Sequence, residues 1–146
     1  MSYSAFFAGL AALLAFSSPN GDESAPKEAF VGKASYYSSK FEGKKTAFGE
    51  VFRNQHFTAA HRTFAYNTLL ELVNLENGKS VVVRVNDRGP WTKRRMIDIS
   101  QAAAHKLGMM SAGIGNVKVR VVGEDGVLFE KEKNILSMAF MPEGIK

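Results

Sequence analysis

The chain has 146 residues, a length typical of a single domain that buries its own core. Its 19 Lys and Arg residues outnumber 14 Asp and Glu residues, and the net charge of +5 favours an anionic partner such as nucleic acid, an acidic glycan or a membrane surface. The sequence has no cysteine, which excludes disulfides, thiolate zinc sites and a lipid-modified cysteine.

The first 29 residues divide into an apolar segment and a polar one. Residues 5–16 are an unbroken apolar run of twelve, shorter than the roughly 20 residues that a membrane-spanning helix needs. We interpret residues 1–17 as a signal peptide, because Ala15 and Ser17 place small residues before a cut after Ser17, although no Lys or Arg precedes the run. The alternative is an apolar tail that anchors or packs. Residues 18–29 contain two prolines and a glycine and predict a solvated linker.

Short apolar or alternating runs separated by turn residues predict a mainly β domain over residues 30–123. Candidate strands lie at residues 31–37, 57–60, 69–74, 80–85, 116–122 and 127–129. Residues 101–107 predict one helix, with Ser100 as its N-cap and Gly108 at its C-terminal end. Short strands with a single helix favour a small barrel or a sandwich over a sheet of alternating strands and helices.

Residues 124–146 form a C-terminal extension that begins with a turn, continues with the charged run EKEK and then becomes apolar. We favour a tail packed on the domain over a segment that binds a partner protein. Nothing in this extension is typical of a catalytic motif.

The segment from Val81 to Ser100 contains the strongest candidate site. The run from Val81 to Val85 predicts a strand, and the Asn, Asp, Gly and Pro residues after it predict that the strand ends in a tight turn. Asp87 is therefore held at a strand end, beside Arg88 and close to Trp91. The alternative is structural: Asp87 caps the turn and pairs with Arg88 as part of the scaffold.

Several segments, taken in this order, resemble the rare lipoprotein A (RlpA-like) family of double-psi β-barrel lytic transglycosylases. The resemblance covers about residues 31–122. The matching pieces are GKASYY at 32–37, TAFGEVF at 46–52, TAAH at 58–61, VNLENGKSVVVRVNDRGP at 73–90 and RMIDISQAAA at 95–104.

The resemblance implies a six-stranded double-psi β-barrel with one or two short helices, an open groove across one face, and the glycan strand of peptidoglycan as substrate. The family's functional positions fall on Glu50, His61 and Asp87. Cleavage of a glycosidic bond requires an acid for the leaving oxygen and stabilisation of positive charge on the sugar ring. We assign Asp87 as the acid that then acts as base, Glu50 as the stabilising or orienting carboxylate, and His61 as the group that holds a carboxylate or hydroxyl. The roles of Glu50 and Asp87 could be exchanged.

Without the resemblance, Glu50 is typical of an exposed turn charge and His61 of a core histidine. Further candidates fall into two groups. Aromatic rings that could stack on sugars, or could instead fill the core, are Tyr36, Tyr37, Phe48 and Trp91. Cations that could bind the lactyl carboxylates of the glycan, or could instead form a solvated basic face, are Arg88 and Arg95, with Lys93 and Arg94 between them in the chain.

The chain departs from the family pattern in three ways. It has no cysteine for a lipid anchor, and the 24 residues from Gly123 to Lys146 are too few for the glycan-binding SPOR domain of many members. The usual Leu-Pro and Gly-Thr after TAAH are replaced in the segment 64–68, FAYNT, which puts the fine substrate preference in question. We therefore expect a periplasmic or exported protein without a stable membrane anchor.

Two other functions fit the same residues: a non-catalytic, expansin-like module that binds wall polysaccharide, and a glycoside hydrolase that uses Glu50 and Asp87 as paired acid and base. Nucleic-acid binding rests on net charge alone, and we do not expect it. We predict no metal and no cofactor, and we expect peptidoglycan glycan strands as the main partner, with cell-division or wall-remodelling proteins as further candidates.

Overall fold

The computed structural model of the chain describes residues 29–139, with side chains described as far as Ile135. The predicted signal peptide lies outside these residues, as do residues 18–28 of the predicted linker. Within residues 29–139, no helix combines the length and the apolar character that crossing a membrane requires.

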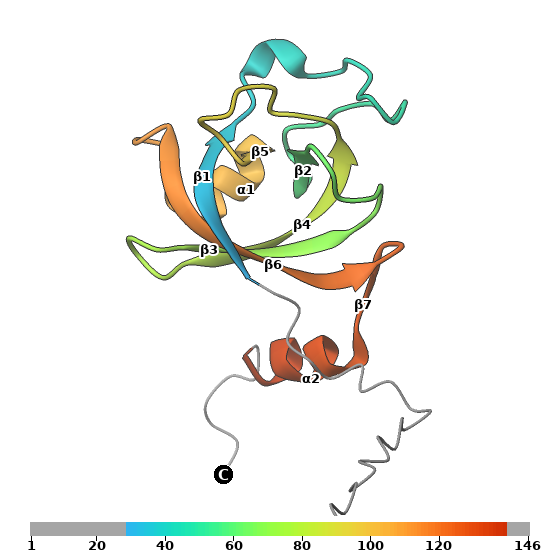
Figure 1. Cartoon of the computed structure of the whole chain (residues 1–146), viewed down its shortest axis with the longest axis vertical. Helices are drawn as coiled ribbons and strands as arrows, with labels where there is room; N and C mark the ends of the chain where they lie inside the picture. The colour runs from blue at the N-terminus through green and yellow to red at the C-terminus, as the bar shows by residue number, and fades with distance from the viewer. Residues whose placement is uncertain (1–28, 140–146) are drawn as a thin grey trace, which may run out of the picture.

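Six strands form a closed barrel (Figure 1). They are β1 (Phe30–Tyr36), β2 (Thr58–His61), β3 (Leu69–Asn74), β4 (Ser80–Asp87), β5 (Ile97–Ile99) and β6 (Ile114–Glu124). Their order is β1-β5-β2-β4-β3-β6, and pairing of β6 with β1 closes the ring. β1 pairs with β5, and β2 with β4, in parallel, whereas the other contacts are antiparallel. The predicted six-stranded barrel is confirmed, and a short seventh strand, β7 (Val127–Leu128), extends from β6.

The core follows from the alternation of side chains along each strand. Val81, Val83 and Val85 of β4 point inward and are at most 4% exposed, while the residues between them are partly exposed. Leu70 and Leu72 of β3 meet them from the neighbouring strand. The core is therefore built from β-branched and leucine side chains of adjacent strands, and it fixes the register that positions the end of β4.

Helix α1 (Gln101–Lys106) packs against β4 and β1. Its N-cap is Ser100, whose side chain accepts a hydrogen bond from the Ala103 N–H, and Gly108 follows its last turn with φ of +65°. Both features were predicted. Ala103 and Ala104 are buried, so small side chains allow the helix to lie close to the barrel.

Most predicted strand ends differ from the structure by one or two residues, and two differences concern β4 and β5. The strand predicted to end at Val85 continues through Asp87, because Asp87 still pairs with Ala60 and Asn86 lies between two paired residues. The strand β5 was missed, because its three residues are too few to show a pattern of alternation.

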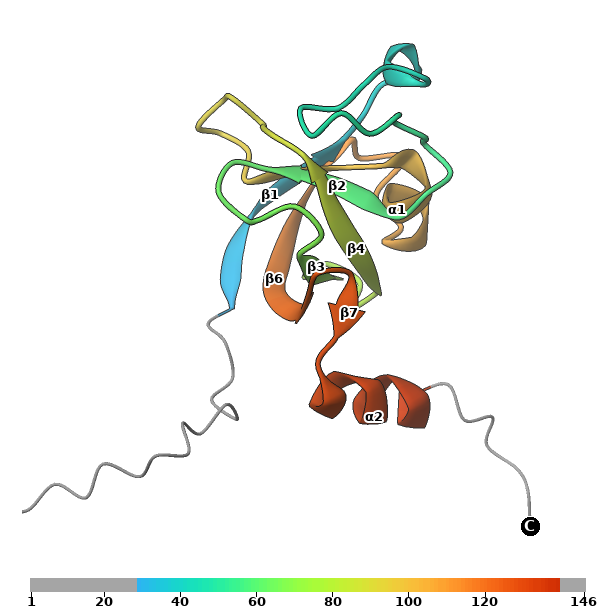
Figure 2. The ribbon, with the colours of Figure 1, turned by 90° about the vertical axis from the view of Figure 1, so that its right-hand side faces the viewer.

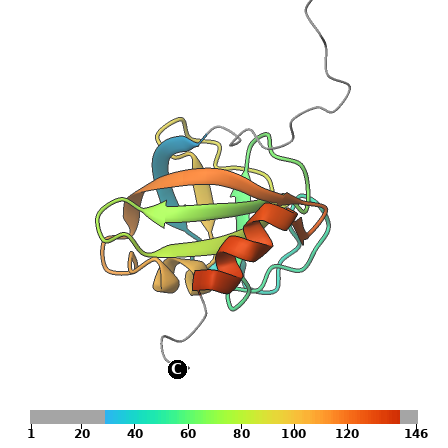
Figure 3. The same ribbon diagram turned by 90° about the horizontal axis from the view of Figure 1, so that it is seen from below.

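The C-terminal segment turns back onto the barrel. Asp125 and Gly126 both have positive φ in the turn between β6 and β7, and helix α2 (Glu130–Ala139) follows. Figures 1 and 2 show α2 at the end of the molecule opposite the short 3₁₀ helix η1 (Ser39–Phe41), and Figure 3 shows it crossing the outside of the sheet. Glu132 of α2 binds both terminal nitrogens of Arg120 on β6, at 2.6 and 2.8 Å. This segment therefore contacts the domain through a bidentate ion pair.

Candidate active site

A short hairpin at residues 44–51 covers the end of β4. Lys45 forms an isolated bridge with Val51, the Thr46 N–H donates to the Glu50 carbonyl at 2.7 Å, and the Gly49 N–H donates to the Thr46 carbonyl at 2.9 Å. The tight turn requires φ of +82° at Gly49, a conformation that other residues rarely adopt. This hairpin carries Glu50 and the Ala47 N–H, which both reach residues of β4.

Glu50 accepts four hydrogen bonds from three side chains. Arg84 holds it with two bonds, Nη2 to Oε1 at 2.5 Å and Nη1 to Oε2 at 2.8 Å, while the Tyr66 hydroxyl donates to Oε2 at 2.8 Å. Asn86 adds a longer bond to Oε1 at 3.3 Å. The hydrogen bonds from Arg84 lower the pKa of Glu50 to about 2 against the opposing effect of burial, and Tyr66 and Asn86 contribute in the same direction. Glu50 is thus a permanent anion at neutral pH, with its side chain 25% exposed.

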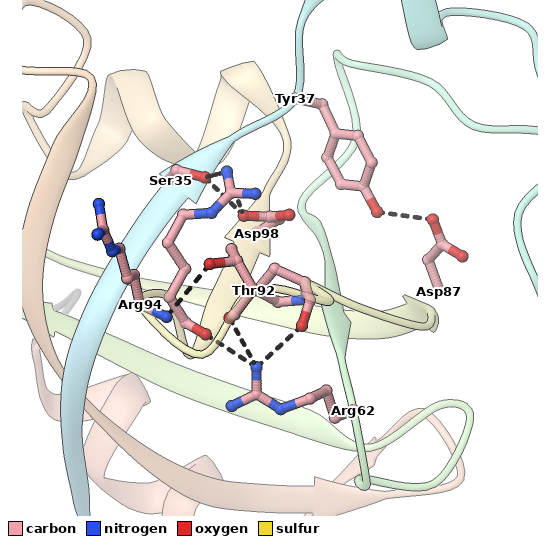
Figure 4. A network of polar contacts seen from close by, with 9 residues as sticks. Ser35, Tyr37, Arg62, Asp87, Thr92, Arg94 and Asp98 are labelled. Carbon is pink, nitrogen blue, oxygen red and sulfur yellow. Dashed lines mark hydrogen bonds and ion pairs between the residues drawn. The ribbon is translucent and has the colours of Figure 1, made fainter.

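Asp87 is held by a different kind of partner. Its Oδ1 accepts from two backbone N–H groups, those of Ala47 and Arg88, both at 2.8 Å. Its Oδ2 accepts from the Tyr37 hydroxyl at 2.6 Å, a pair that Figure 4 shows. Burial, followed by the hydrogen bond to Asp87, raises the pKa of Tyr37 well above its ordinary value, so the phenol keeps its proton. The bond to the Arg88 N–H shows that Asp87 does cap its turn.

A β-bulge in β4 explains how Asp87 reaches the hairpin that carries Glu50. In the pairing of β2 with β4, Ala59 lies opposite Val85 and Ala60 lies opposite Asp87, so Asn86 is an extra residue. A bulge breaks the strict alternation of side chains and redirects the residues beside it. Asn86 therefore contacts Glu50 while its neighbour Asp87 contacts Ala47 of the same hairpin. The structure brings Glu50 and Asp87 to one region at the end of β4.

His61 lies at the end of β2, on the strand that pairs with β4. Its Nδ1 accepts from the Thr63 and Phe64 N–H groups, both at 3.2 Å, and its ring packs on that of Phe64 at 4.2 Å. Burial and the nearby charges of Arg62 and Arg88 lower the pKa of His61 to about 4. The imidazole is therefore neutral, with its proton on Nε2. Its Nδ1 accepts hydrogen bonds from the loop that follows β2, and not from a group that binds Glu50 or Asp87.

The four candidate aromatic residues lie in different surroundings. Tyr36 packs against the core and donates to the Met110 carbonyl at 2.9 Å, away from the carboxylates, which is the core-filling alternative. Tyr37 reaches the site through its hydroxyl, while its ring lies 4.4 Å from that of Phe52. Phe48 is half-buried on the hairpin and packs on Tyr66, and Trp91 is exposed.

The two candidate cations both bind protein groups. Arg88 donates to the carbonyls of His61 and Phe64, and its guanidinium lies over the Phe48 ring at 4.6 Å. The Arg88 side chain therefore binds these groups, and not Asp87 as the structural alternative had supposed. Arg95 donates to the Ser35 hydroxyl at 2.6 Å and pairs with Asp98 at 3.3 Å. Among the described residues both guanidinium groups bind protein atoms, and their contact with a glycan carboxylate stays a prediction.

Three contributors to the site were not predicted from the sequence: Arg84, Asn86 and Tyr66. Arg84 and Asn86 are two apart on β4, and alternation along a strand could have placed them on one face with any carboxylate above it. Tyr66 had no such signal. It lies in the segment 64–68 that departs from the family pattern, and there it supplies a hydroxyl to Glu50.

Among residues 29–139, no group of three or more His, Cys, Asp or Glu side chains could hold a metal ion. The chemistry that this arrangement offers is that of two carboxylates, one permanently charged and one held by a phenol and backbone amides. Such a pair suits the cleavage of a glycosidic bond, in which one carboxyl group protonates the leaving oxygen and the other stabilises positive charge on the sugar.

A closed six-stranded barrel with two parallel strand pairs defines the class of double-psi β-barrel domains. Residues 29–119 match a family model described as "Lytic transglycolase". Because this match covers more than half of the chain, the chain belongs to the lytic transglycolase family.

Curated relatives share the name endolytic peptidoglycan transglycosylase RlpA. The chain is 48% identical over 91 residues to the protein of that name from Haemophilus influenzae, covering 62% of this chain and 32% of the relative. It is 52% identical over 88 residues to a probable enzyme of that name from Treponema pallidum, covering 60% and 28%. The chain thus spans about a third of the length of the curated relatives it matches.

Solved structures agree on the fold. The Streptomyces papain inhibitor superposes with a TM-score of 0.55 at 24% identity, covering 67% of this chain and 97% of the inhibitor. A mutant expansin from Clavibacter michiganensis, in complex with cellohexaose, superposes with a TM-score of 0.53 at 20% identity, covering 66% and 51%. At these identities the likeness supports the barrel fold and carries no function.

Proposed function

We propose that this domain is a peptidoglycan lytic transglycosylase, which cleaves the β-1,4 bond between N-acetylmuramic acid and N-acetylglucosamine and leaves 1,6-anhydro-N-acetylmuramic acid ends. Membership of the lytic transglycolase family and the shared name of the curated relatives support this activity. Peptidoglycan would then be met on the periplasmic or exported side of the cell, where cell-division or wall-remodelling proteins are further candidate partners.

The observation that carries the proposal is the difference between the partners of the two carboxylates. Glu50 is bound by a guanidinium, which can only donate, and its pKa of about 2 leaves it without a proton to give at neutral pH. Asp87 is bound at Oδ2 by the Tyr37 hydroxyl, which can donate to a carboxylate or accept from a carboxylic acid, whereas the Tyr66 hydroxyl on Glu50 shares Oε2 with Arg84. Asp87 therefore has a neighbour that suits both protonation states, and the acid role falls to it rather than to Glu50.

The reaction then proceeds in two proton transfers. Protonated Asp87 gives its proton to the glycosidic oxygen as the bond from that oxygen to C1 of N-acetylmuramic acid breaks, and the departing sugar leaves as an alcohol. Positive charge on the remaining ring is stabilised by the fixed anion Glu50. The 6-hydroxyl of the same sugar attacks C1, and its proton passes to the Asp87 carboxylate, which restores the starting state.

His61 contributes a neutral donor in this scheme. Because Nδ1 accepts from the 63–64 backbone, Nε2 carries the proton and can donate to a sugar hydroxyl without adding a positive charge beside the developing cation. Tyr37, with the Ala47 and Arg88 N–H groups, holds Asp87 in position.

The test is mass spectrometry of peptidoglycan sacculi, with and without stem peptides, after incubation with the purified protein. New 1,6-anhydro ends that are absent with an Asp87→Asn variant of unchanged circular dichroism are the expected result. Reducing ends would instead identify a hydrolase, and binding to sacculi without new ends would identify a wall-binding module. Full activity of the Asp87→Asn variant would overturn the assignment of the acid.

A further inference from the structure

Trp91 is an unusual surface residue. It is the single tryptophan of the chain, and its side chain is 78% exposed, the highest value among the large hydrophobic side chains that the structure describes as exposed. It lies between β4 and β5, four positions after Asp87 in the sequence. Tryptophan is on average highly buried in folded proteins, so an exposed indole four residues after Asp87 is a candidate contact for a ligand.

The backbone on both sides of Trp91 is held by one side chain, Arg62. Its Nη1 lies 2.9 Å from the Pro90 carbonyl and 3.3 Å from the Thr92 carbonyl, the two residues that flank Trp91. The same nitrogen lies 2.9 Å from the Arg95 carbonyl at the other end of the loop, so three carbonyls converge on it (Figure 4). Arg62 thus closes residues 90–95 into a compact loop around a single cation.

A second set of contacts fixes the end of this loop to the barrel. Arg95 donates to the Ser35 hydroxyl of β1 and pairs with Asp98 of β5, while Ser35 donates to Asp98 at 2.5 Å. The next residue, Met96, donates from its N–H to the Lys33 carbonyl at 2.8 Å. The loop is therefore anchored to two strands, although its tip faces solvent.

We propose that Arg62 is a positioning residue that holds Trp91 as a rigid stacking platform for one pyranose ring of the glycan strand, next to the bond that Asp87 cleaves. This inference rests on the proposed function, because it names the occupant of the platform as the same glycan. Arg62 follows His61, and Trp91 follows the Asp87 turn, so the platform and the proposed catalytic residues share the ends of β2 and β4.

The surroundings of Trp91 favour a peptidoglycan sugar over a neutral or apolar partner. The flat indole suits the C–H face of a pyranose ring. Lys93 and Arg94 are exposed on the same loop and would attract the lactyl carboxylate that N-acetylmuramic acid carries. A loop that is already held in place loses little conformational entropy on binding, which is the physical benefit of the Arg62 contacts.

The single tryptophan makes the test direct, because intrinsic fluorescence reports on Trp91 alone. Glycan strands free of stem peptides are titrated into the Asp87→Asn protein, in which binding is separated from cleavage. We expect a saturable change in Trp91 emission. In the free protein, Arg62→Ala should lower the fluorescence anisotropy of Trp91, and it should weaken glycan binding by about tenfold while the thermal unfolding midpoint stays close to that of the parent.

Arg62→Lys is the matched control, since it keeps the charge and removes the guanidinium that reaches the three carbonyls. It should resemble Arg62→Ala both in anisotropy and in the loss of glycan affinity. An Arg62→Lys protein that binds glycan as tightly as the parent would mean that charge alone is responsible and would overturn the positioning role. A double-mutant cycle completes the test, because Arg62→Ala should weaken binding much less when Trp91 is already alanine.

The inference and the proposed function can fail separately. Cleavage of sacculi with no response of Trp91 emission to glycan would overturn the platform and leave the enzyme assignment intact. A saturable Trp91 response that Arg62→Ala weakens, without any cleavage by the parent protein, would support the platform and overturn the transglycosylase. In the active protein, Arg62→Ala should raise KM and leave kcat within about twofold, and a loss confined to kcat would contradict the proposal.

Discussion

Two arginine–carboxylate clusters in this barrel are built from the same kind of ion pair but differ in the number of carboxylates that each arginine binds. Arg120 of β6 lies between two carboxylates, Glu71 of β3 opposite it at 2.6 Å and Glu132 of α2. Arg84 of β4 faces one carboxylate, Glu50, which also receives bonds from a phenol and an amide. One cation shared by two anions cross-links three elements. Glu50, in contrast, is one anion that accepts from three side chains, so its negative charge is fixed on the hairpin that Asp87 also contacts.

The comparison predicts that loss of charge at Glu50 is the more damaging change for activity. Glu50→Gln should reduce glycan cleavage by about 100-fold or more, because the amide no longer stabilises positive charge on the sugar ring. Glu71→Gln, the matched variant in the Arg120 cluster, should keep cleavage within about twofold. Both are measured by the rate at which new anhydro ends appear. Equal inactivation by the two variants would show that ion pairing, rather than position, is what matters.

For stability, we expect the Arg120 cluster to matter more than for activity. Arg120→Ala should lower the free energy of unfolding by about 1–3 kcal/mol, because two partly buried carboxylates lose their charged donor. Urea denaturation measures this change, and hydrogen exchange should show faster exchange in residues 130–135, where α2 contacts the barrel. Cleavage by the folded variant should be unaltered. Unchanged unfolding and exchange would mean that α2 is held by something other than Arg120.

A smaller effect is expected for the neutral donor on Glu50. Tyr66→Phe keeps the ring beside Phe48 and removes the hydroxyl that donates to Oε2. The loss of one hydrogen bond to a carboxylate should reduce kcat by roughly 3- to 10-fold and change KM little. Steady-state kinetics on stem-peptide-free glycan distinguish the two parameters. A change in KM alone would make Tyr66 a sugar contact rather than a partner of Glu50.

The effect expected at His61 is one on stability, and it is measured by varying the pH. Its pKa falls from the ordinary 6.5 to about 4 in the folded protein, so the unfolded chain binds a proton more readily. The stabilising contribution is therefore complete above pH 6.5 and is lost as the pH falls toward about 4. His61→Asn retains an acceptor for the Thr63 and Phe64 N–H groups without this titration. Its stability should decline less than that of the parent across that window, as measured by thermal unfolding at a series of pH values.

Regular patterns made the barrel predictable from the sequence. The strand Leu69–Asn74 was predicted with the bounds that the structure gives, because a short, mainly apolar run is followed by the turn-forming sequence LENG at residues 75–78. The end of β4 was misplaced by two residues, because Asn86 and Asp87 are turn-forming types that a bulge retains within the sheet. A preference for turns is a local property, whereas pairing depends on the neighbouring strand.

The environment of the site residues was less predictable than their identity. Asp87 was recognised as a candidate, yet its partners Tyr37 and Ala47 are 50 and 40 positions away in the chain. Such contacts follow from barrel closure and from the hairpin at 44–51, neither of which leaves a local pattern. Tyr36 and Tyr37 show the same limit. Tyr36 is the last residue of β1 and packs against the core, whereas Tyr37 follows the strand and its hydroxyl reaches Asp87.

The placement of the two ends of the described chain has a practical consequence. The start of β1 and the helix α2 lie together at one end of the barrel, while the loop between β4 and β5 and the helix η1 lie at the other (Figures 1 and 2). A bead, a sensor surface or a fused protein can be joined beyond either end with the loop between β4 and β5 facing outward. The barrel is thus suited to oriented immobilisation, in which every attached copy presents the same end of the barrel to the solution.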